Sequence, residues 1–225
     1  MKVIVFGATG MVGQGVLREC LLDPAVQRVL TVGRSATGQK HEKLSELVHP
    51  DLTDYGRITA DLKGYDACFF CLGVSSVAMA EADYRRVTYG IALSAARALV
   101  DVNPGMTFIF VSGAGADGTG KSRTMWARVK GETENAVLAL PFKGRYVFRP
   151  AFIRPMHGIT SRTRSYRILY AIVSPIVPLL SALFPRHVTT TERVGRAMLN
   201  VARNGSAKPI LENQDINAAA ADPIG

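Results

Sequence analysis

The sequence predicts an α/β protein built on a doubly wound parallel sheet. Short hydrophobic runs, rich in β-branched and aromatic residues, alternate along the chain with longer segments whose apolar residues recur at helical spacing. This alternation is typical of parallel βαβ units, whose helices cover both faces of the sheet. The length of 225 residues and the absence of internal repeats indicate a single domain, 1–225, with a core at 1–150 and a smaller region at 151–225 packed on it.

The individual elements follow from the same pattern. The run at residues 67–72 has no polar residue, as expected of a central strand covered on both faces. Proline and glycine end the helices, at Asp23-Pro24 and at Asn103-Pro104-Gly105. After Pro150 the pattern changes to loops and helices, so we expect a small, mostly helical C-terminal region. The expected strands are 2–6, 28–32, 44–48, 67–72, 107–111 and 145–148, and the expected helices of the core are 11–22, 83–102 and about 123–140.

The composition limits the class of protein. Hydrophobic residues make up 48% of the chain and charged residues 20%, as in ordinary globular domains, and three cysteines cannot form a disulfide framework at this length. The formal net charge of +9 favours an anionic partner. Direct nucleic-acid binding is not expected, because no recognition-helix, zinc-finger or stacking pattern is visible. No basic leader or cleavage site of an export signal is found, which predicts a cytoplasmic protein.

A glycine-rich turn lies between the first predicted strand and the first predicted helix. Gly7 permits a tight turn, Gly10 allows the backbone to approach a pyrophosphate, and Gly13 lets the helix pack on the strand. Backbone N–H groups at the helix start, together with the positive end of the helix dipole, bind phosphates. The turn therefore predicts a Rossmann-like dinucleotide site made of Gly7, Ala8, Thr9, Gly10, Met11, Val12 and Gly13.

The end of the second predicted strand indicates which dinucleotide binds. Proteins that bind NAD usually carry an acidic residue there, which holds the ribose 2′-hydroxyl. Here the sequence reads Val32-Gly33-Arg34-Ser35, without an acid. Arg34 would pair with the 2′-phosphate of NADP and Ser35 would add a hydroxyl donor, although a solvated surface arginine is the alternative. NADP is therefore favoured over NAD.

With these residues in place, the chain resembles the short-chain dehydrogenase/reductase superfamily, and in particular the atypical branch that contains the Tat-interacting protein and its bacterial relatives. The resemblance spans nearly the whole chain. The segments that carry it are 7–13, 33–35, 51–54, 71–73, 112–117, 129–132, 148–150 and 190–197.

The resemblance implies further contacts with the cofactor. Asp51 and Leu52 would lie beside the adenine, and Leu72 and Gly73 would line the cofactor at the end of the fourth strand. Phe148-Arg149-Pro150 would lead into the loop beside the nicotinamide, which places Arg149 and Pro150 among the cofactor residues.

The resemblance also implies catalytic roles. Ser112 would polarise a substrate carbonyl, and Lys130 would hold the nicotinamide ribose and lower the pKa of a catalytic tyrosine. The family's Tyr-x-x-x-Lys appears here as Trp126-Ala127-Arg128-Val129-Lys130. Residues four apart share a helix face, so Trp126 takes the place of the tyrosine. Indole does not titrate near neutral pH and cannot deliver a proton to a developing alkoxide.

Two functions remain open at this point. The first is an NADP-dependent oxidoreductase that acts on a small, apolar carbonyl or alcohol and uses another proton donor, which could be water, Tyr84, Tyr89 or Tyr166. The second is a catalytically silent module that senses NADP or binds a protein. The full-length resemblance to enzymes favours the oxidoreductase.

The C-terminal region contains an uncharged stretch from Ile168 to Phe184, preceded by several arginines. Pro175 and Pro178 would break a helix inside it, so a membrane span is not expected. We interpret it as a wall or lid of the substrate pocket, as the contact of a homodimer, or as a membrane-surface element.

Three further patterns point to structure rather than to chemistry. Cys68 and Cys71 lie three apart in a strand and therefore on opposite faces, so they cannot share a metal or form a disulfide. The four histidines have no ligand spacing, and no metal site is expected. Thr189 is expected to begin a helix, with Glu192 reaching back to cap it.

Overall fold

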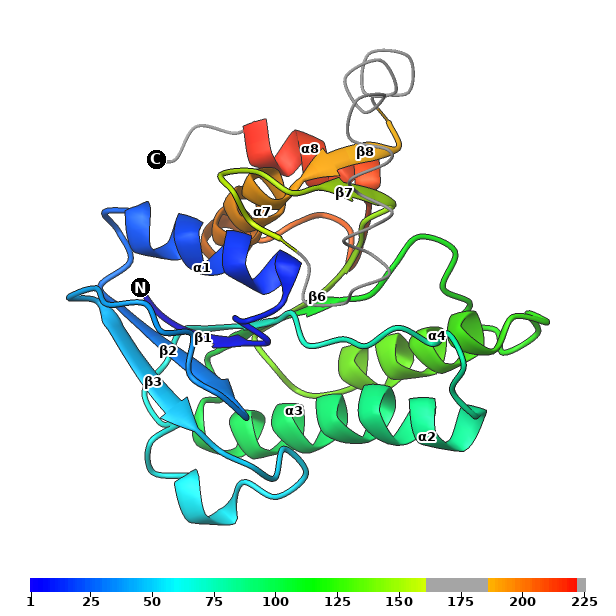
Figure 1. Cartoon of the computed structure of the whole chain (residues 1–225), viewed down its shortest axis with the longest axis horizontal. Helices are drawn as coiled ribbons and strands as arrows, with labels where there is room; N and C mark the ends of the chain where they lie inside the picture. The colour runs from blue at the N-terminus through cyan, green and yellow to red at the C-terminus, as the bar shows by residue number, and fades with distance from the viewer. Residues whose placement is uncertain (161–185, 222–225) are drawn as a thin grey trace.

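The computed structural model describes residues 1–160 and 186–221 and has a seven-stranded parallel sheet at its centre (Figure 1). The strand order is β3-β2-β1-β4-β5-β6-β9, so the direction of winding reverses between β1 and β4. This confirms the predicted doubly wound α/β fold. The strands of this sheet are β1 (Lys2–Phe6), β2 (Arg28–Gly33), β3 (Leu44–Val48), β4 (Ala67–Phe70), β5 (Thr107–Val111), β6 (Gly144–Arg149) and β9 (Ile210–Glu212).

Helices cover both faces of the sheet (Figure 1). One face carries α1 (Met11–Leu22), α7 (Thr191–Asn204) and α8 (Asn213–Ala221). The expected helix 83–102 is observed as a continuous helical run from Glu81 to Val102, with a π-helical turn in its middle. The other face carries this run, which comprises α2 (Glu81–Arg85), η2 (Arg86–Gly90) and α3 (Ile91–Val102), together with α4 (Met125–Leu138). A short 3-10 turn, η1 (Gly56–Ile58), precedes β4.

The core consists of two hydrophobic clusters, one on each face of the sheet. In β1, Val3 and Val5 belong to the cluster under α1 and α7, whereas Ile4 and Phe6 belong to the cluster over α3. The alternation explains why the central strands are apolar at every position. It also confirms that Cys68 and Cys71 face opposite sides: Cys68 lies in the α3 cluster, Cys71 packs against the other, and both thiols are free.

The C-terminal region differs from the expected loops and helices, because it also contains three short strands. β7 (Phe152–Arg154) and β8 (Val188–Thr190) pair in parallel as a separate two-stranded sheet. β9 lies beside β6 and extends the main sheet by one strand. Strands of three residues are too short to show the alternation on which a sequence-based strand assignment depends.

The start of α7 also differs from its prediction by one residue. Thr190 is the N-cap, and its hydroxyl accepts a hydrogen bond of 3.0 Å from the Arg193 N–H. Thr189 belongs to β8, and any of three successive threonines offers the same capping chemistry. The Glu192 carboxylate contacts His157, 3.0 Å away, and Arg196, at 3.7 Å.

Helices α1 and α7 pack at very short range and join the C-terminal region to the core. A Cβ atom on Gly15 would lie 2.5 Å from the Cβ of Thr191, and one on Gly195 would lie 2.7 Å from the Cγ of Glu19. Only glycine at these two positions allows the helices to approach this closely. The C-terminal region therefore packs directly on the face of the sheet that α1 covers.

The uncharged stretch from Ile168 to Phe184 lies outside the described residues, and its three interpretations stay predictions. Among the helices of residues 1–160 and 186–221, we find none with the length and hydropathy of a membrane span.

The close contact of α1 with α7 leads to a prediction about stability. We expect Gly15→Ala to lower the free energy of unfolding by about 2–3 kcal/mol, because the added methyl group meets the backbone of Thr191. Gly90→Ala is the matched control: Gly90 is also helical, and its Cβ would meet nothing within 4 Å. Urea unfolding of both variants measures the difference. Equal stability of Gly15→Ala and the unchanged protein would contradict the close packing.

Candidate functional site

The glycine turn brings three parts of the backbone together at the carboxyl ends of β1 and β4. Gly7 has a φ of +74°, and a Cβ on it would lie 2.7 Å from the backbone of Leu72. A Cβ on Gly13 would overlap the Gly7 carbonyl oxygen, and the Gly10 N–H donates to that oxygen at 2.9 Å. The predicted turn is thus in direct backbone contact with the start of α1 and with the segment after β4 that includes Leu72 and Gly73.

The start of α1 offers unpaired backbone donors. Gly10 is the N-cap, and no side chain of the described residues caps the helix there. The first bond to the N-cap carbonyl comes from the Gln14 N–H at 2.8 Å, so the N–H groups of Met11, Val12 and Gly13 have no partner within the helix. These donors and the helix dipole can hold an anion.

Arg34 and Ser35 follow β2 directly, and both are exposed. Within the described part of the chain, the Arg34 guanidinium takes part in no ion pair. The loop that carries these residues is fixed by Glu46 on β3, whose carboxylate accepts from the N–H and the hydroxyl of Thr37 at 2.6 and 2.5 Å. An exposed guanidinium on an anchored loop can bind an anionic group.

Asp51 and Leu52 lie after β3 and have different environments. Asp51 is exposed, and its carboxylate accepts from the hydroxyl and the N–H of Thr53, at 2.6 and 2.8 Å, which lowers its pKa. Leu52 is only 4% exposed and belongs to the core cluster over α3. A contact of Leu52 with an adenine would therefore use its backbone rather than its side chain.

Ser112 and the Lys130 amine both lie at the end of β5. Ser112 follows this strand and is 7% exposed; its N–H donates to the Phe148 carbonyl at 2.8 Å, and its hydroxyl oxygen has no hydrogen-bond partner among the described residues. The Lys130 ammonium reaches from α4 to the Val111 carbonyl at 3.4 Å. A buried hydroxyl without a partner is unfavourable. The hydrogen bond that Ser112 lacks would be supplied by a polar atom of a ligand or by a water molecule.

The environment of Lys130 lowers its pKa. Its nitrogen lies 5.5 Å from the centre of the Phe110 ring, and no carboxylate of the described residues is within ion-pair distance of it. Burial lowers the pKa of Lys130 from its ordinary value of 10.5 to about 8, and the negative charge of Glu134 opposes this shift. The lysine therefore titrates close to neutral pH.

Trp126 lies in the first turn of α4, one helical turn before Lys130, and is half-buried. A Cβ on Gly115 would be 3.6 Å from the far edge of the indole, so Trp126 reaches the loop that follows β5. Asp117, for which the sequence predicts no role of its own, holds this loop: its carboxylate accepts from the N–H groups of Thr119 and Ser122 at 2.9 and 2.6 Å.

Arg149 is held in a network that the sequence did not reveal. Its guanidinium binds the Glu134 carboxylate through two hydrogen bonds of 2.5 and 3.0 Å, and the Glu212 carboxylate at 3.0 Å. These bonds join β6 to α4 and to β9. The roles of Arg149 and of the buried Pro150 beside the cofactor stay predictions, and Glu134 and Glu212 are residues that sequence analysis missed.

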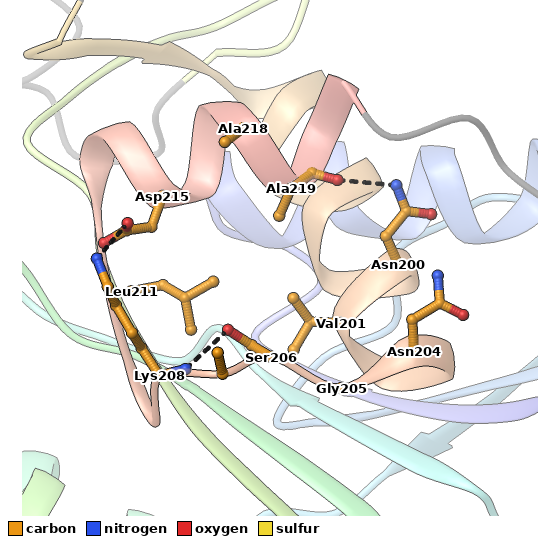
Figure 2. A pocket seen from close by; sticks show the side chains of 11 residues that line it. Asn200, Val201, Asn204, Gly205, Ser206, Lys208, Leu211, Asp215, Ala218 and Ala219 are labelled. Atoms are coloured by element: carbon orange, nitrogen blue, oxygen red, sulfur yellow. Dashed lines mark hydrogen bonds and ion pairs between the residues drawn. The ribbon is translucent and has the colours of Figure 1, made fainter.

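Two hollows lined by described residues lie away from these groups. One, of about 320 Å³, lies between α7, α8 and β9; Figure 2 shows the 2.8 Å pair of Lys208 and Asp215 at its edge and the Asn200 amide donating to the Ala219 carbonyl. The other, of about 380 Å³, is lined by Gln14 and Arg18 of α1 and by His41 and His157 among others. Neither is lined by Ser112 or Lys130. Among residues 1–160 and 186–221, no three His, Cys, Asp or Glu side chains are grouped to hold a metal ion.

The chain belongs to the NAD dependent epimerase/dehydratase family, whose pattern matches residues 3–135. This match, with the glycine turn and the doubly wound sheet, confirms the predicted resemblance to short-chain dehydrogenases/reductases and the expectation of a nicotinamide cofactor. Whether that cofactor is NADP or NAD is not determined by the match.

The chain is also similar in sequence to fungal relatives and in fold to solved structures. "Protein FMP52-2, mitochondrial" of Scheffersomyces stipitis is 27% identical over 212 residues, covering 93% of this chain and 89% of the relative. "Protein fmp52, mitochondrial" of Aspergillus clavatus is 32% identical over 158 residues, covering 68% of this chain and 66% of the relative. The fold is similar to that of the dTDP-glucose 4,6-dehydratase DesIV of Streptomyces venezuelae, solved with NAD and TYD, at a TM-score of 0.71 and 15% identity over 99% of this chain and 80% of that one. An oxidoreductase of the short-chain dehydrogenase/reductase family from Burkholderia thailandensis gives 0.69 and 16% identity over 97% and 92% of the two chains.

The expectation of a cytoplasmic protein is wrong, because the fungal relatives are named mitochondrial proteins. An expectation drawn from export-signal patterns alone does not distinguish the cytoplasm from an organelle.

The lowered pKa of Lys130 leads to a prediction about how stability depends on pH. Between about pH 8 and pH 10.5 the unfolded chain binds this proton and the folded chain does not, so the free energy of unfolding rises with pH across that window. We expect Lys130→Met to increase the free energy of unfolding at pH 7 by about 2 kcal/mol and to remove this rise. Urea unfolding at several pH values is the measurement. Lys143→Met, at an exposed position, should change neither quantity, and an unchanged pH profile in Lys130→Met would contradict the burial of the amine.

Proposed function

We propose that this protein is an NADP-dependent oxidoreductase that acts on a small, apolar carbonyl compound or alcohol. The observation that carries the proposal is the buried hydroxyl of Ser112, which has no hydrogen-bond partner in the described part of the chain and lies next to the carbonyl that the Lys130 amine contacts. These two groups lie at the end of β5, on the same edge of the sheet as the glycine turn at the end of β1. Ligands of open α/β sheets bind at this edge.

The residues of the turn fit a dinucleotide. The N–H groups of residues 11–13 would hold the pyrophosphate. Glycine at positions 7 and 13 lets the turn and the start of α1 take up the positions this requires, because a larger side chain at either position would clash with the backbone. Arg34 and Ser35 would hold a 2′-phosphate, which is the basis for preferring NADP over NAD. Lys130 would contact the nicotinamide ribose. When bound, the nicotinamide ring supplies or accepts the hydride.

The chemistry at the substrate depends on two side chains. The Ser112 hydroxyl would donate a hydrogen bond to the substrate carbonyl oxygen and so stabilise the charge that develops on it. Trp126 would form an apolar wall and transfer no proton. The proton must therefore come from another group.

The candidate donors are not equivalent. Tyr84 is 2% exposed, the ring of Tyr89 lies 4.5 Å from the Arg85 guanidinium, and Tyr166 is outside the described residues. The pKa of Lys130, about 8, is close to the value at which a general acid works best near neutral pH. We therefore propose that either Lys130 or a water molecule donates the proton that the substrate oxygen needs.

The alternative function is a catalytically silent module that senses NADP or binds a protein. It is favoured by Trp126, which stands where the family's pattern has the proton-donating tyrosine. A small-molecule substrate distinguishes the two functions, because only the oxidoreductase requires one. The homodimer and the membrane-surface contact stay predictions under either function.

The first prediction of this proposal concerns the cofactor. Trp126 is the single tryptophan of the chain, so quenching of its fluorescence reports binding at the site. We expect NADPH to bind more tightly than NADH, and Arg34→Ala to weaken NADPH roughly 10- to 100-fold while leaving NADH unchanged, because the lost bond is charge-assisted. Arg97→Ala, another exposed arginine, should alter neither affinity. Unchanged discrimination in Arg34→Ala would refute the role of Arg34, and no binding of any nicotinamide dinucleotide would refute the proposal.

The second prediction separates the enzyme from the sensor. We expect the protein to oxidise NADPH in a screen of aldehydes, ketones and quinones, and Trp126→Tyr to raise kcat about 10- to 100-fold, because it adds a titratable hydroxyl one turn from Lys130. Trp126→Phe removes the indole without adding a hydroxyl and should give no gain. Activity that appears only in Trp126→Tyr would favour the sensor.

A further inference from the structure

Lys130 stands at one end of a line of alternating charges that crosses three elements. Glu134 follows it by one turn on α4 and is 1% exposed. Arg149 of β6 binds both oxygens of Glu134, at 2.5 and 3.0 Å, and also binds Glu212 of β9 at 3.0 Å. The order along the line is therefore ammonium, carboxylate, guanidinium and carboxylate, and it ends at the half-exposed Glu212.

Glu134 is the acidic group whose charge acts on Lys130. The amine itself meets only the Val111 carbonyl and the Phe110 ring of β5 among the described residues. The helical run packed against α4 contributes two ion pairs, Arg85 with Glu132 and Arg128 with Glu81. Both pairs are open to solvent, which screens them, and each is neutral as a whole.

We propose that the buried pair of Glu134 and Arg149 is the device that sets the charge of Lys130, with Glu134 favouring the ammonium and Arg149 limiting that effect. A guanidinium bound through two hydrogen bonds neutralises most of the charge of a carboxylate. Lys130 therefore feels only part of the charge of Glu134, which leaves the amine able to lose its proton near neutral pH. Glu134 and Arg149 are positioning residues in this scheme, since they act through Lys130.

The proposal predicts shifts of opposite sign. Removing the charge of Glu134 takes away the acidic group that favours the ammonium and leaves the charge of Arg149 under-compensated, so Lys130 should lose its proton at lower pH. Removing Arg149 leaves Glu134 with its full charge, so Lys130 should keep its proton to higher pH. A purely structural ion pair would lower the stability in both variants and would not move this titration in two directions.

The test measures the titration of Lys130 directly in the cofactor-free protein. The pH dependence of its acetylation by acetic anhydride, followed by mass spectrometry, gives the midpoint at which the amine becomes reactive. We expect Glu134→Gln to lower the midpoint by about one pH unit and Arg149→Met to raise it by about one unit. The double variant, which removes both charges, should return close to the midpoint of the unchanged protein.

Glu132→Gln is the matched control, because it makes the same replacement on the same helix in another ion pair with arginine. Its midpoint should not move. If the buried variants do not fold, Glu212→Gln on the half-exposed end of the line should lower the midpoint by a smaller amount, since it also leaves Arg149 under-compensated. Shifts of the same sign in Glu134→Gln and Arg149→Met, a shift in Glu132→Gln as large as in Glu134→Gln, or no shift in Glu212→Gln would overturn the proposal.

The inference rests on the proposed function only for its effect on the cofactor. If Lys130 contacts the dinucleotide, the pH midpoint of NADPH binding, followed by Trp126 fluorescence, should move with the acetylation midpoint in each variant. Acetylation midpoints that shift while NADPH binding does not would refute the proposed contact and leave the charge-setting pair in place.

Discussion

The site depends on a backbone contact that only glycine permits. The carbonyl of Gly7 lies where a side chain on Gly13 would be, and the backbone of Leu72 lies where a side chain on Gly7 would be. This contact fixes the start of α1 above the ends of β1 and β4, the point at which the sheet reverses its winding. The first N–H groups of α1, which have no partner within the helix, thereby lie at the edge of the sheet where Ser112 and Lys130 also lie.

A second constraint sets the chemistry at that edge. Ser112 is buried with no hydrogen-bond partner among the described residues, and burial lowers the pKa of Lys130. Both features are unfavourable for the protein alone, and both become favourable when a polar ligand completes the site. A ligand with oxygen atoms would supply the missing hydrogen bonds, which supports the proposed contacts with a ribose and a carbonyl substrate.

The sequence was sufficient for most of the fold, because long segments with clear periodicity define their own structure. The strands at 2–6, 44–48 and 107–111 and the helix at 11–22 match their predicted bounds. The short strands β7 and β9 could not be predicted, since three residues carry no period. The site divides in the same way: the glycine turn and the spacing of Trp126 and Lys130 are local patterns, whereas the partner of Arg149 on β9 is 63 residues away and becomes visible only in three dimensions.

The position of β9 at the border of the main sheet has a consequence for how this polypeptide can be divided. A fragment ending after β6 would leave the backbone donors and acceptors of that strand uncovered, which invites association with other chains. It would also lack α7, which packs closely against α1. Residues 186–221 therefore pack on both β6 and α1, and we expect a shortened form that contains only the first six strands to associate with other chains.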